Sequence, residues 1–189
     1  MTRISGFLLG AVLSAWGSAA LADSFSDTVT LFKNAGESAW FFSNCYGYAV
    51  FPTVGKAGLV VGGAHGKGRV YEHGKYVGDA SVTQLSVGLQ AGGQAYSQIV
   101  FFEDERAFKD FTRGDFEFGA DVSAVAITAA AQASAGTSGA SAGASGGKKD
   151  AVTSGTYHSG LAVFTIVKGG AMYQATVAGQ KFKFTPRSR

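Results

Sequence analysis

Residues 50–71 form a glycine-rich apolar stretch that constrains the fold of this chain more than any other part of the sequence. Its 22 residues contain six glycines and three basic residues among β-branched positions. Glycine inside strand-like apolar runs is typical of bulges, strong coiling and close backbone contact. Residues 56–71 therefore predict one long bent strand, or two strands joined by a glycine bend. Residues 59–71 and 76–91 are expected to pair as a β-hairpin around a turn at 72–75.

The rest of the chain predicts two helices and further strands. Residues 24–42 have the apolar spacing of an amphipathic helix, for which core packing is the favoured role and membrane-surface binding the alternative. Acidic residues at the start of 103–111 predict a short second helix. In residues 82–91 apolar and polar side chains alternate, as in an antiparallel sheet with one solvated face. The remaining strands are predicted at residues 45–52 (ended by Pro52), 96–102, 116–128, 151–157, 161–167 and 171–177.

These elements indicate the α+β class. We expect a strongly curved antiparallel β-sheet, open or closed into a barrel, packed against the N-terminal amphipathic helix and the one short helix. The composition, 46% hydrophobic and 15% charged, is that of a globular chain. An Ala/Ser/Gly-rich loop at 129–149 interrupts the predicted domain, and we interpret it as either functional or disordered.

The N-terminus has the pattern of a secretory signal peptide over residues 1–22. Arg3 gives a positive start, and residues 7–16 are an apolar run too short to cross a bilayer. Ala20 and Ala22 then form an A-x-A cleavage pattern. Residues 23–189 are therefore expected to be a single exported domain, periplasmic or extracellular, at the periphery of a membrane.

Motifs that would carry catalysis or cofactor binding do not meet their structural requirements. Residues 62–68 lack the first glycine and the hydroxyl position of a phosphate-binding loop, which argues against nucleotide binding. The G-x-S-x-G match at 139–143 lies in low-complexity sequence rather than at a strand-to-helix turn. His65, His73 and His158 do not have the spacing of a metal site. We therefore expect a non-enzymatic protein with no catalytic residues, cofactor or metal, and its weak net positive charge argues against nucleic acid.

Basic and aromatic residues are interleaved around the predicted hairpin, where residues 50–78 carry four bases and one acid. Such side chains suit an anionic lipid surface, because the charges are attracted to headgroups and the rings settle at the interface. The alternative is a solvated sheet face with ordinary lysines. The predicted lipid-binding residues are Lys56, Lys67, Arg69, Lys75, Phe51, Tyr71 and Tyr76.

Four long segments carry a family resemblance: residues 49–68 (AVFPTVGKAGLVVGGAHGKG), 87–102 (VGLQAGGQAYSQIVFF), 116–126 (FEFGADVSAVA) and 168–182 (KGGAMYQATVAGQKF). They resemble the SYLF-domain family, lipid-binding domains of secreted bacterial proteins and of eukaryotic actin-patch proteins. The resemblance implies phospholipid binding, with phosphoinositide binding in eukaryotic members and actin binding in some. Eukaryotic members are described as using a basic N-terminal helix, whereas residues 24–42 contain only Lys33 as a base.

An exported protein would meet neither actin nor phosphoinositides, so the part of the resemblance that transfers is phospholipid binding. We expect a non-catalytic phospholipid-binding domain that associates with anionic membrane surfaces or holds lipid in the concavity of the sheet. The alternative is a structural or protein-interaction module of the cell envelope, with an envelope protein as its partner.

Overall fold

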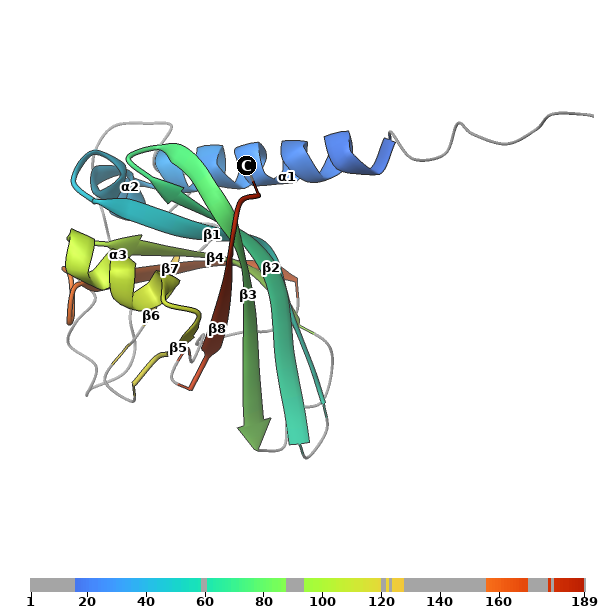
Figure 1. Cartoon of the computed structure of the whole chain (residues 1–189). Coiled ribbons are helices and arrows are strands. Elements are labelled where there is room, and N and C mark those ends of the chain that lie inside the picture. Colours follow the sequence, from blue (N-terminus) through green and yellow to red (C-terminus); the bar gives the residue numbers. More distant parts are fainter. Residues whose placement is uncertain are drawn as a thin grey trace, which may run out of the picture.

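The computed structural model describes residues 16–58, 61–87, 94–119, 122, 124–127, 156–169, 177 and 179–188 (Figure 1). Three α-helices, one 3₁₀ turn and eight strands are assigned within these ranges. In chain order they are α1 (Trp16–Asn34), α2 (Gly36–Ala39), η1 (Trp40–Ser43), β1 (Gly47–Gly58), β2 (Val61–Glu72), β3 (Lys75–Val87), β4 (Gln94–Phe102), α3 (Glu105–Thr112), β5 (Asp115–Glu117), β6 (Ala124–Ile127), β7 (Leu161–Gly169) and β8 (Lys181–Pro186), where η1 is a single 3₁₀ turn.

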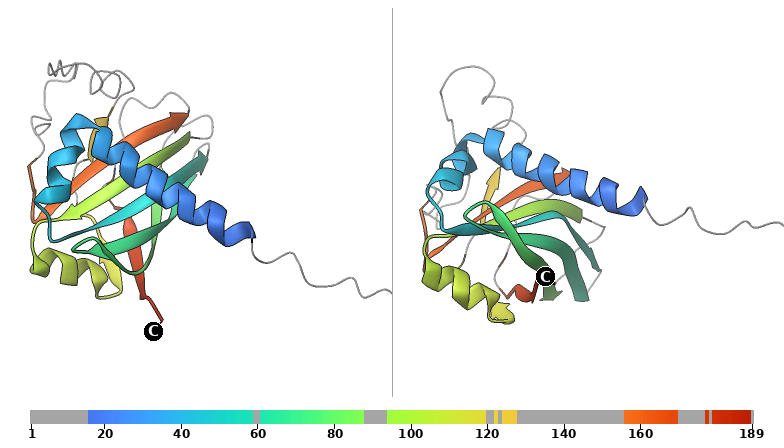
Figure 2. Two further views of the ribbon diagram at one scale, coloured as in Figure 1. Left: turned by 90° about the horizontal axis from the view of Figure 1, so that it is seen from above. Right: turned by 45° about the horizontal axis from the view of Figure 1, so that its top comes forward.

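The eight strands form one mixed sheet in the order β5-β8-β3-β2-β1-β4-β7-β6. Neighbouring strands are antiparallel except for β6 and β7, which are parallel. The sheet curls into a half-barrel, so that β3 and β8 run across the direction of β4 and β7 (Figure 1). Helix α1 lies on the outer, convex face, and α3 lies on the inner side (Figure 2). The predicted α+β class with a strongly curved sheet is confirmed.

Aromatic side chains cover both faces of the sheet. The inner cluster includes Phe51, Phe102, Phe111 and Phe182, and α3 packs against it. The outer cluster lies beneath α1, α2 and η1, and contains Phe25, Phe32, Phe41, Phe101 and Phe164. Strand β4 contributes side chains to both clusters, because successive residues of a strand point to opposite faces of the sheet. This double burial explains why residues 99–102 read as a continuous apolar run rather than an alternating one.

The N-terminal helix is shorter at its C-terminal end than predicted. The sequence predicted one helix over 24–42, but α1 ends at Asn34 and Ala35 is extended before α2 begins. Gly36 follows directly, and glycine has a low helix propensity. The Ser38 hydroxyl donates to the Phe32 carbonyl oxygen at 2.6 Å across this break. Phe25, Phe32 and Ala35 are buried at helical spacing, which fits the predicted core-packing role.

Pro52 lies within β1 and does not end it. The pairing register of β1 shifts between Val50 and Thr53 on the β2 side, and between Phe51 and Val54 on the β4 side. A bulge accommodates a proline in a central strand, because proline has no N–H to donate to the ladder. The predicted hairpin is confirmed as β2 and β3, with His73 and Gly74 as a two-residue turn in which both φ angles are positive.

The buried face of β3 is not the one that the sequence pattern favours. The alternation in residues 82–91 predicts that the more apolar face is buried, but the structure buries the other face. Val82 and Gln84 are buried, whereas Thr83 and Leu85 are exposed.

The strand predicted at 116–128 is found as two short strands, β5 and β6, at opposite ends of the sheet. The predicted loop at 129–149 and most of the strands predicted at 151–157 and 171–177 lie outside the described residues, as do residues 1–15. No described helix is both long enough and apolar enough to span a membrane.

Candidate functional site

The basic residues of the β2–β3 hairpin separate into an outer row and a turn. Lys67 and Arg69 alternate with buried glycine and valine positions and therefore point to the outer face of β2. Lys75 is exposed at the start of β3, opposite Glu72 in the pairing. Lys56 pairs in register with Ala64, but its side chain lies outside the described part of the structure.

The three predicted aromatic site residues occupy different environments. Phe51 is completely buried in the inner cluster, 5.6 Å from the ring of Phe182, so its ring does not reach the outer surface. Tyr71 is half-buried and stacks on Tyr48 with ring centroids 4.9 Å apart. Tyr76 is also half-buried, and its ring centroid lies 6.0 Å from that of Tyr71. Only the two tyrosines border the outer surface.

Strand β8 adds two lysines beside this hairpin that the sequence prediction did not include. In the pairing register Lys183 lies opposite Ser81 of β3, which in turn lies opposite Lys67 of β2. The row continues to Thr53 of β1, whose hydroxyl is 3.3 Å from the Nζ atom of Lys168. Neighbouring strands are about 4.8 Å apart, so Lys67 and Lys183 flank Ser81 at about one strand spacing on each side.

A second row runs parallel to the first. Lys181 lies opposite Thr83, which lies opposite His65 of β2. The Lys181 ammonium is 3.5 Å from the Glu117 carboxylate, and both side chains are more than half exposed. Leu85, on the same face two residues beyond Thr83, is 81% exposed. The charge and aromatic alternation at residues 181–184 was visible in the sequence, but its place beside Lys67 depends on the sheet order.

Two arginines border these rows and stack on one aromatic ring. The guanidinium carbons of Arg69 and Arg187 lie 5.3 Å and 5.5 Å from the centroid of Tyr76. Arg69 also stacks on Phe25 of α1 at 4.4 Å, which joins the helix to β2. The Tyr76 hydroxyl donates to Asp79 at 2.9 Å, which fixes the ring. We call the surface formed by Lys67, Arg69, Lys181, Lys183 and Arg187 the outer basic face.

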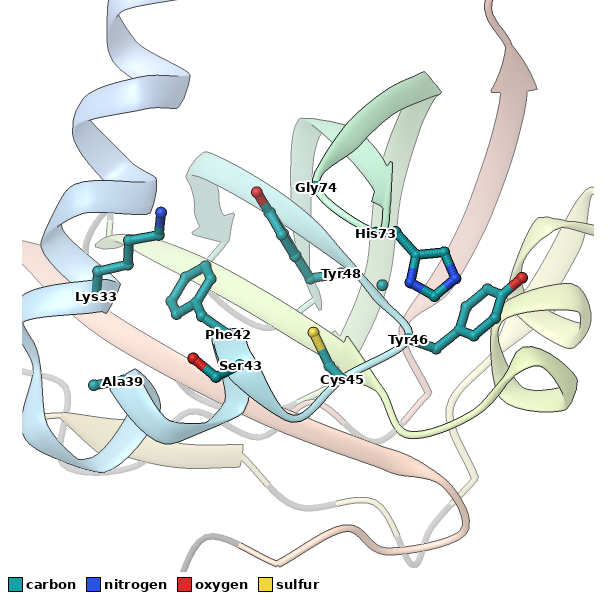
Figure 3. Close-up of a pocket in the computed structure, with 10 residues that line it drawn as sticks. Lys33, Ala39, Phe42, Ser43, Cys45, Tyr46, Tyr48, His73 and Gly74 are labelled. Carbon is teal, nitrogen blue, oxygen red and sulfur yellow. The ribbon is translucent and has the colours of Figure 1, made fainter.

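A separate pocket of about 340 Å³ lies between the helices and the β2–β3 turn (Figure 3). Lys33 and Phe42 form one side, Tyr46 and His73 the other, and the Cys45 sulfur lies between them (Figure 3). The other lining residues are Ala39, Ser43, Gly47, Tyr48 and Gly74. The sequence prediction missed this site, because its walls come from the helices, from β1 and from the β2–β3 turn, which only the fold brings together.

Burial and local bonds set the protonation and orientation of the groups in this pocket. Burial raises the pKa of the Cys45 thiol to about 11 and that of the Tyr48 hydroxyl to about 12. Both groups therefore stay neutral near pH 7 and can donate hydrogen bonds. The Tyr46 hydroxyl donates to Glu72 at 2.7 Å, and this bond to a carboxylate raises the pKa of Tyr46 to about 12. The rings of Tyr46 and His73 lie 4.4 Å apart.

Comparison with known proteins identifies the family. The family model Ysc84, described as "Las17-binding protein actin regulator", matches residues 83–183, which is more than half of the chain. The chain belongs to the Ysc84 (SYLF-domain) family. The matched region begins within β3 and includes β4, α3 and β7 as well as the two lysines of β8. The predicted resemblance to SYLF domains is thereby confirmed.

One curated protein resembles most of this Ysc84-family chain. It is "Beta cell expansion factor A" of Aeromonas veronii, 27% identical over 156 residues. The alignment covers 82% of this chain and 51% of the relative, so the chain spans about half the length of that protein.

Among the residues that the structure describes, no three histidine, cysteine or acidic side chains gather as a metal site. The features that these residues offer to a partner are the outer basic face and the pocket.

Proposed function

We propose that this protein is an exported, non-catalytic domain that binds anionic phospholipid surfaces through the outer basic face. The observation that carries the proposal is the position of Lys67 on β2 and of Lys181 and Lys183 on β8, the two strands that flank β3. Of these three lysines, Lys67 and Lys183 make no ion pair within the described residues. An ordinary solvated sheet face would be expected to alternate its charges, because like charges near one another are unfavourable. Here the positive charges accumulate, which favours an anionic partner.

Exposed and stacked groups support a membrane rather than a soluble anion as the partner. Leu85 is 81% exposed on the same face and can enter the interfacial region while the neighbouring lysines remain at the headgroups. Tyr76 lies between two guanidinium groups at the border of the face. Aromatic rings beside basic residues suit the water–lipid interface, where both the ring and the charge are stabilised.

Export and a periplasmic or extracellular location belong to the same proposal. They are supported by Arg3, by the short apolar run at 7–16, and by the A-x-A pattern that ends at Ala22. Residues 23–189 would then form one mature domain. Helix α1 begins at Trp16, before the proposed cleavage position, so removal of residues 1–22 would shorten it and keep the buried residues Phe25 and Phe32.

The proposal is tested by sedimentation with liposomes of zwitterionic lipid alone and of zwitterionic lipid mixed with phosphatidylglycerol. A basic residue near an anionic surface contributes about 1 kcal/mol. Allowing for the Glu117 partner of Lys181, the variant Lys67→Gln/Lys181→Gln/Lys183→Gln should lose about 2–3 kcal/mol, or about 30- to 150-fold in affinity. Binding should also weaken between about 0.1 M and about 1 M salt, as the Debye length falls from about 10 Å to about 3 Å.

Helix α3 provides a control with the same change in net charge. Arg106, Lys109 and Arg113 are each more than 60% exposed and each lies within 4 Å of an acid of the same segment. The variant Arg106→Gln/Lys109→Gln/Arg113→Gln should bind liposomes like the wild type, because α3 is on the inner side of the sheet. Equal losses in the two variants would show that net charge alone drives binding and would contradict a role for the outer basic face.

Protein binding is the second candidate function, and the family description favours it because that description names a Las17-binding actin regulator. For this chain the proposed partner would be a protein of the cell envelope. The sheet is open, and its outermost described strands are β5 and β6. Absence of binding to either kind of liposome at low salt would overturn the lipid proposal and favour this candidate.

A further inference from the structure

The pocket beside the β2–β3 turn has the size of a binding site for a small molecule. Its volume of about 340 Å³ lies at the lower end of the range for ligand pockets, roughly 300–1,000 Å³. Its walls come from α1, from η1 and from the strands around the turn, so its shape depends on how the helices are seated on the sheet (Figure 3). The outer basic face does not share a residue with it.

Of the ten lining residues only Lys33 is formally charged at pH 7, and its positive charge favours an anion. One lysine, Lys33, and one histidine, His73, lie on opposite sides, and no aspartate or glutamate is among the ten lining residues. Within the described part of the chain Lys33 makes no ion pair, and its Nζ atom lies 5.4 Å from the centroid of the Phe42 ring. A cationic ligand would be repelled by Lys33, whereas an anion would gain an ammonium partner that no described carboxylate occupies.

Neutral donors and aromatic faces complete the lining. The Cys45 thiol and the Tyr48 hydroxyl stay protonated at neutral pH, and Ser43 adds a third group of this kind. Such groups can donate to phosphate oxygens without adding negative charge. The rings of Phe42 and Tyr48, with centroids 5.3 Å apart, offer apolar surface to the carbon atoms of a small alcohol. The lining therefore combines anion recognition with room for a small organic group.

We propose that this pocket binds a phosphate ester of a small polar alcohol, with the Lys33 ammonium at one end of the ligand and the His73 imidazole at the other. A phospholipid headgroup and a free phosphate ester share this chemistry. Identification of the ligand as a lipid headgroup rests on the function proposed above, whereas recognition of a phosphate ester does not. In the lipid case the outer basic face supplies general attraction to the membrane, and the pocket selects the headgroup.

The test is isothermal titration calorimetry of the full chain with three probes: inorganic phosphate, glycerophosphoglycerol, and dihexanoyl-phosphatidylglycerol below its micelle concentration. The variants are Lys33→Gln and His73→Asn. Asparagine is chosen because residue 73 has a φ of 47°, a conformation in which asparagine is favoured among non-glycine residues. Loss of a hydrogen bond to a charged group should weaken binding of glycerophosphoglycerol about tenfold or more in each variant. The matched control is Lys109→Gln on α3, which lies outside both the pocket and the outer basic face and should leave this affinity unchanged.

The outcomes distinguish a lipid headgroup from a free phosphate ester as the ligand of the pocket. They also distinguish binding in the pocket from binding to the outer basic face. Tighter binding of the short-chain lipid than of glycerophosphoglycerol, with both weakened by Lys33→Gln, assigns the pocket to a lipid headgroup. Equal binding of these two probes assigns it to free phosphate esters. If none of the three probes gives a heat of binding, or if the wild type and both variants bind with equal affinity, the proposal that this pocket binds a phosphate ester is contradicted. Because the pocket and the outer basic face share no residue, failure of one proposal leaves the other measurable.

Discussion

Substitution of Gly68 by alanine tests how tightly β1 and β2 pack on the inner face. A Cβ atom built at Gly68 would lie 2.5 Å from Cδ1 of Phe51 and 2.9 Å from the carbonyl oxygen of Val50. Real Cβ atoms do not approach other atoms so closely, so the Phe51 ring or the β1 backbone must move. The ring has little room, because it is completely buried and packs against Phe182.

The size of the effect follows from two opposing terms. Overpacking of a filled core costs about 1–3 kcal/mol. Alanine also restricts the unfolded chain, which returns about 0.4–1 kcal/mol. The expected net destabilisation for Gly68→Ala is therefore about 1–2 kcal/mol, or about 2–8 °C in Tm for a chain of this length.

The assay is thermal unfolding followed by circular dichroism, with Gly55→Ala as the matched control. Gly55 lies in the adjacent strand β1, and a Cβ atom there would meet nothing within 4 Å. Gly55→Ala should leave Tm unchanged or raise it slightly. Phe51→Leu should cost less in the Gly68→Ala background than in the wild type, because the smaller side chain makes room. Equal Tm values for the two alanine variants, or additive effects of Phe51→Leu, would refute the reasoning.

Two further predictions concern buried polar groups. Gln98 and Gln180 exchange side-chain hydrogen bonds of 2.8 Å and 3.1 Å inside the half-barrel. Gln180→Leu should therefore lower the free energy of unfolding in urea by about 1–3 kcal/mol, because it leaves Gln98 without its partner, and adding Gln98→Leu should recover part of this loss. A further loss of stability in the double variant would contradict this pairing. Burial raises the pKa of Cys45 from 9.0 to about 11, so the unfolded thiol ionises first and stability should fall as pH rises from about 9 to about 11. Tm measured across this range should fall more steeply for the wild type than for Cys45→Ala, and parallel curves would show that the thiol does not contribute.

Elements with strong local signals were predictable from the sequence. The β2–β3 hairpin was predicted because glycine and polar residues cluster at the turn, and His73 and Gly74 do adopt the left-handed conformations that such a turn needs. Helix α3 was predicted from the acidic residues at its start. The Asp104 side chain accepts a hydrogen bond from the Ala107 N–H at 2.8 Å, and it caps the helix.

Other features depend on contacts that no local pattern contains. Alternation in β3 gives the two faces but not which one is buried, and the buried side proved to carry Gln84 while Leu85 is exposed. The bulge around Pro52 changes the parity of β1, so Phe51 and Val54 share the inner face although they are three residues apart.

The candidate sites divide in the same way. Lys67 and Arg69 could be placed on the outer face by alternation alone. The two lysines of β8 became neighbours of Lys67 only through the sheet order, because β8 lies more than 100 residues further along the chain. The pocket joins Lys33 of α1 to His73 of the turn, and no spacing rule connects residues of two such elements.

The parallel pairing of β6 with β7 sets a minimum length for the segment that connects them. Ile127 ends β6 opposite Ile166, so the chain must return five residues along β7 to begin it at Leu161, a distance of about 17 Å. A parallel crossover needs about a dozen residues, and 33 separate Ile127 from Leu161. Removal of residues 136–146 would leave 22, and halving a loop changes its closure free energy by only about 0.6 kcal/mol. The length of this segment can therefore vary without altering the register of the sheet, and a Tm of the deletion variant within about 3 °C of the wild type is expected.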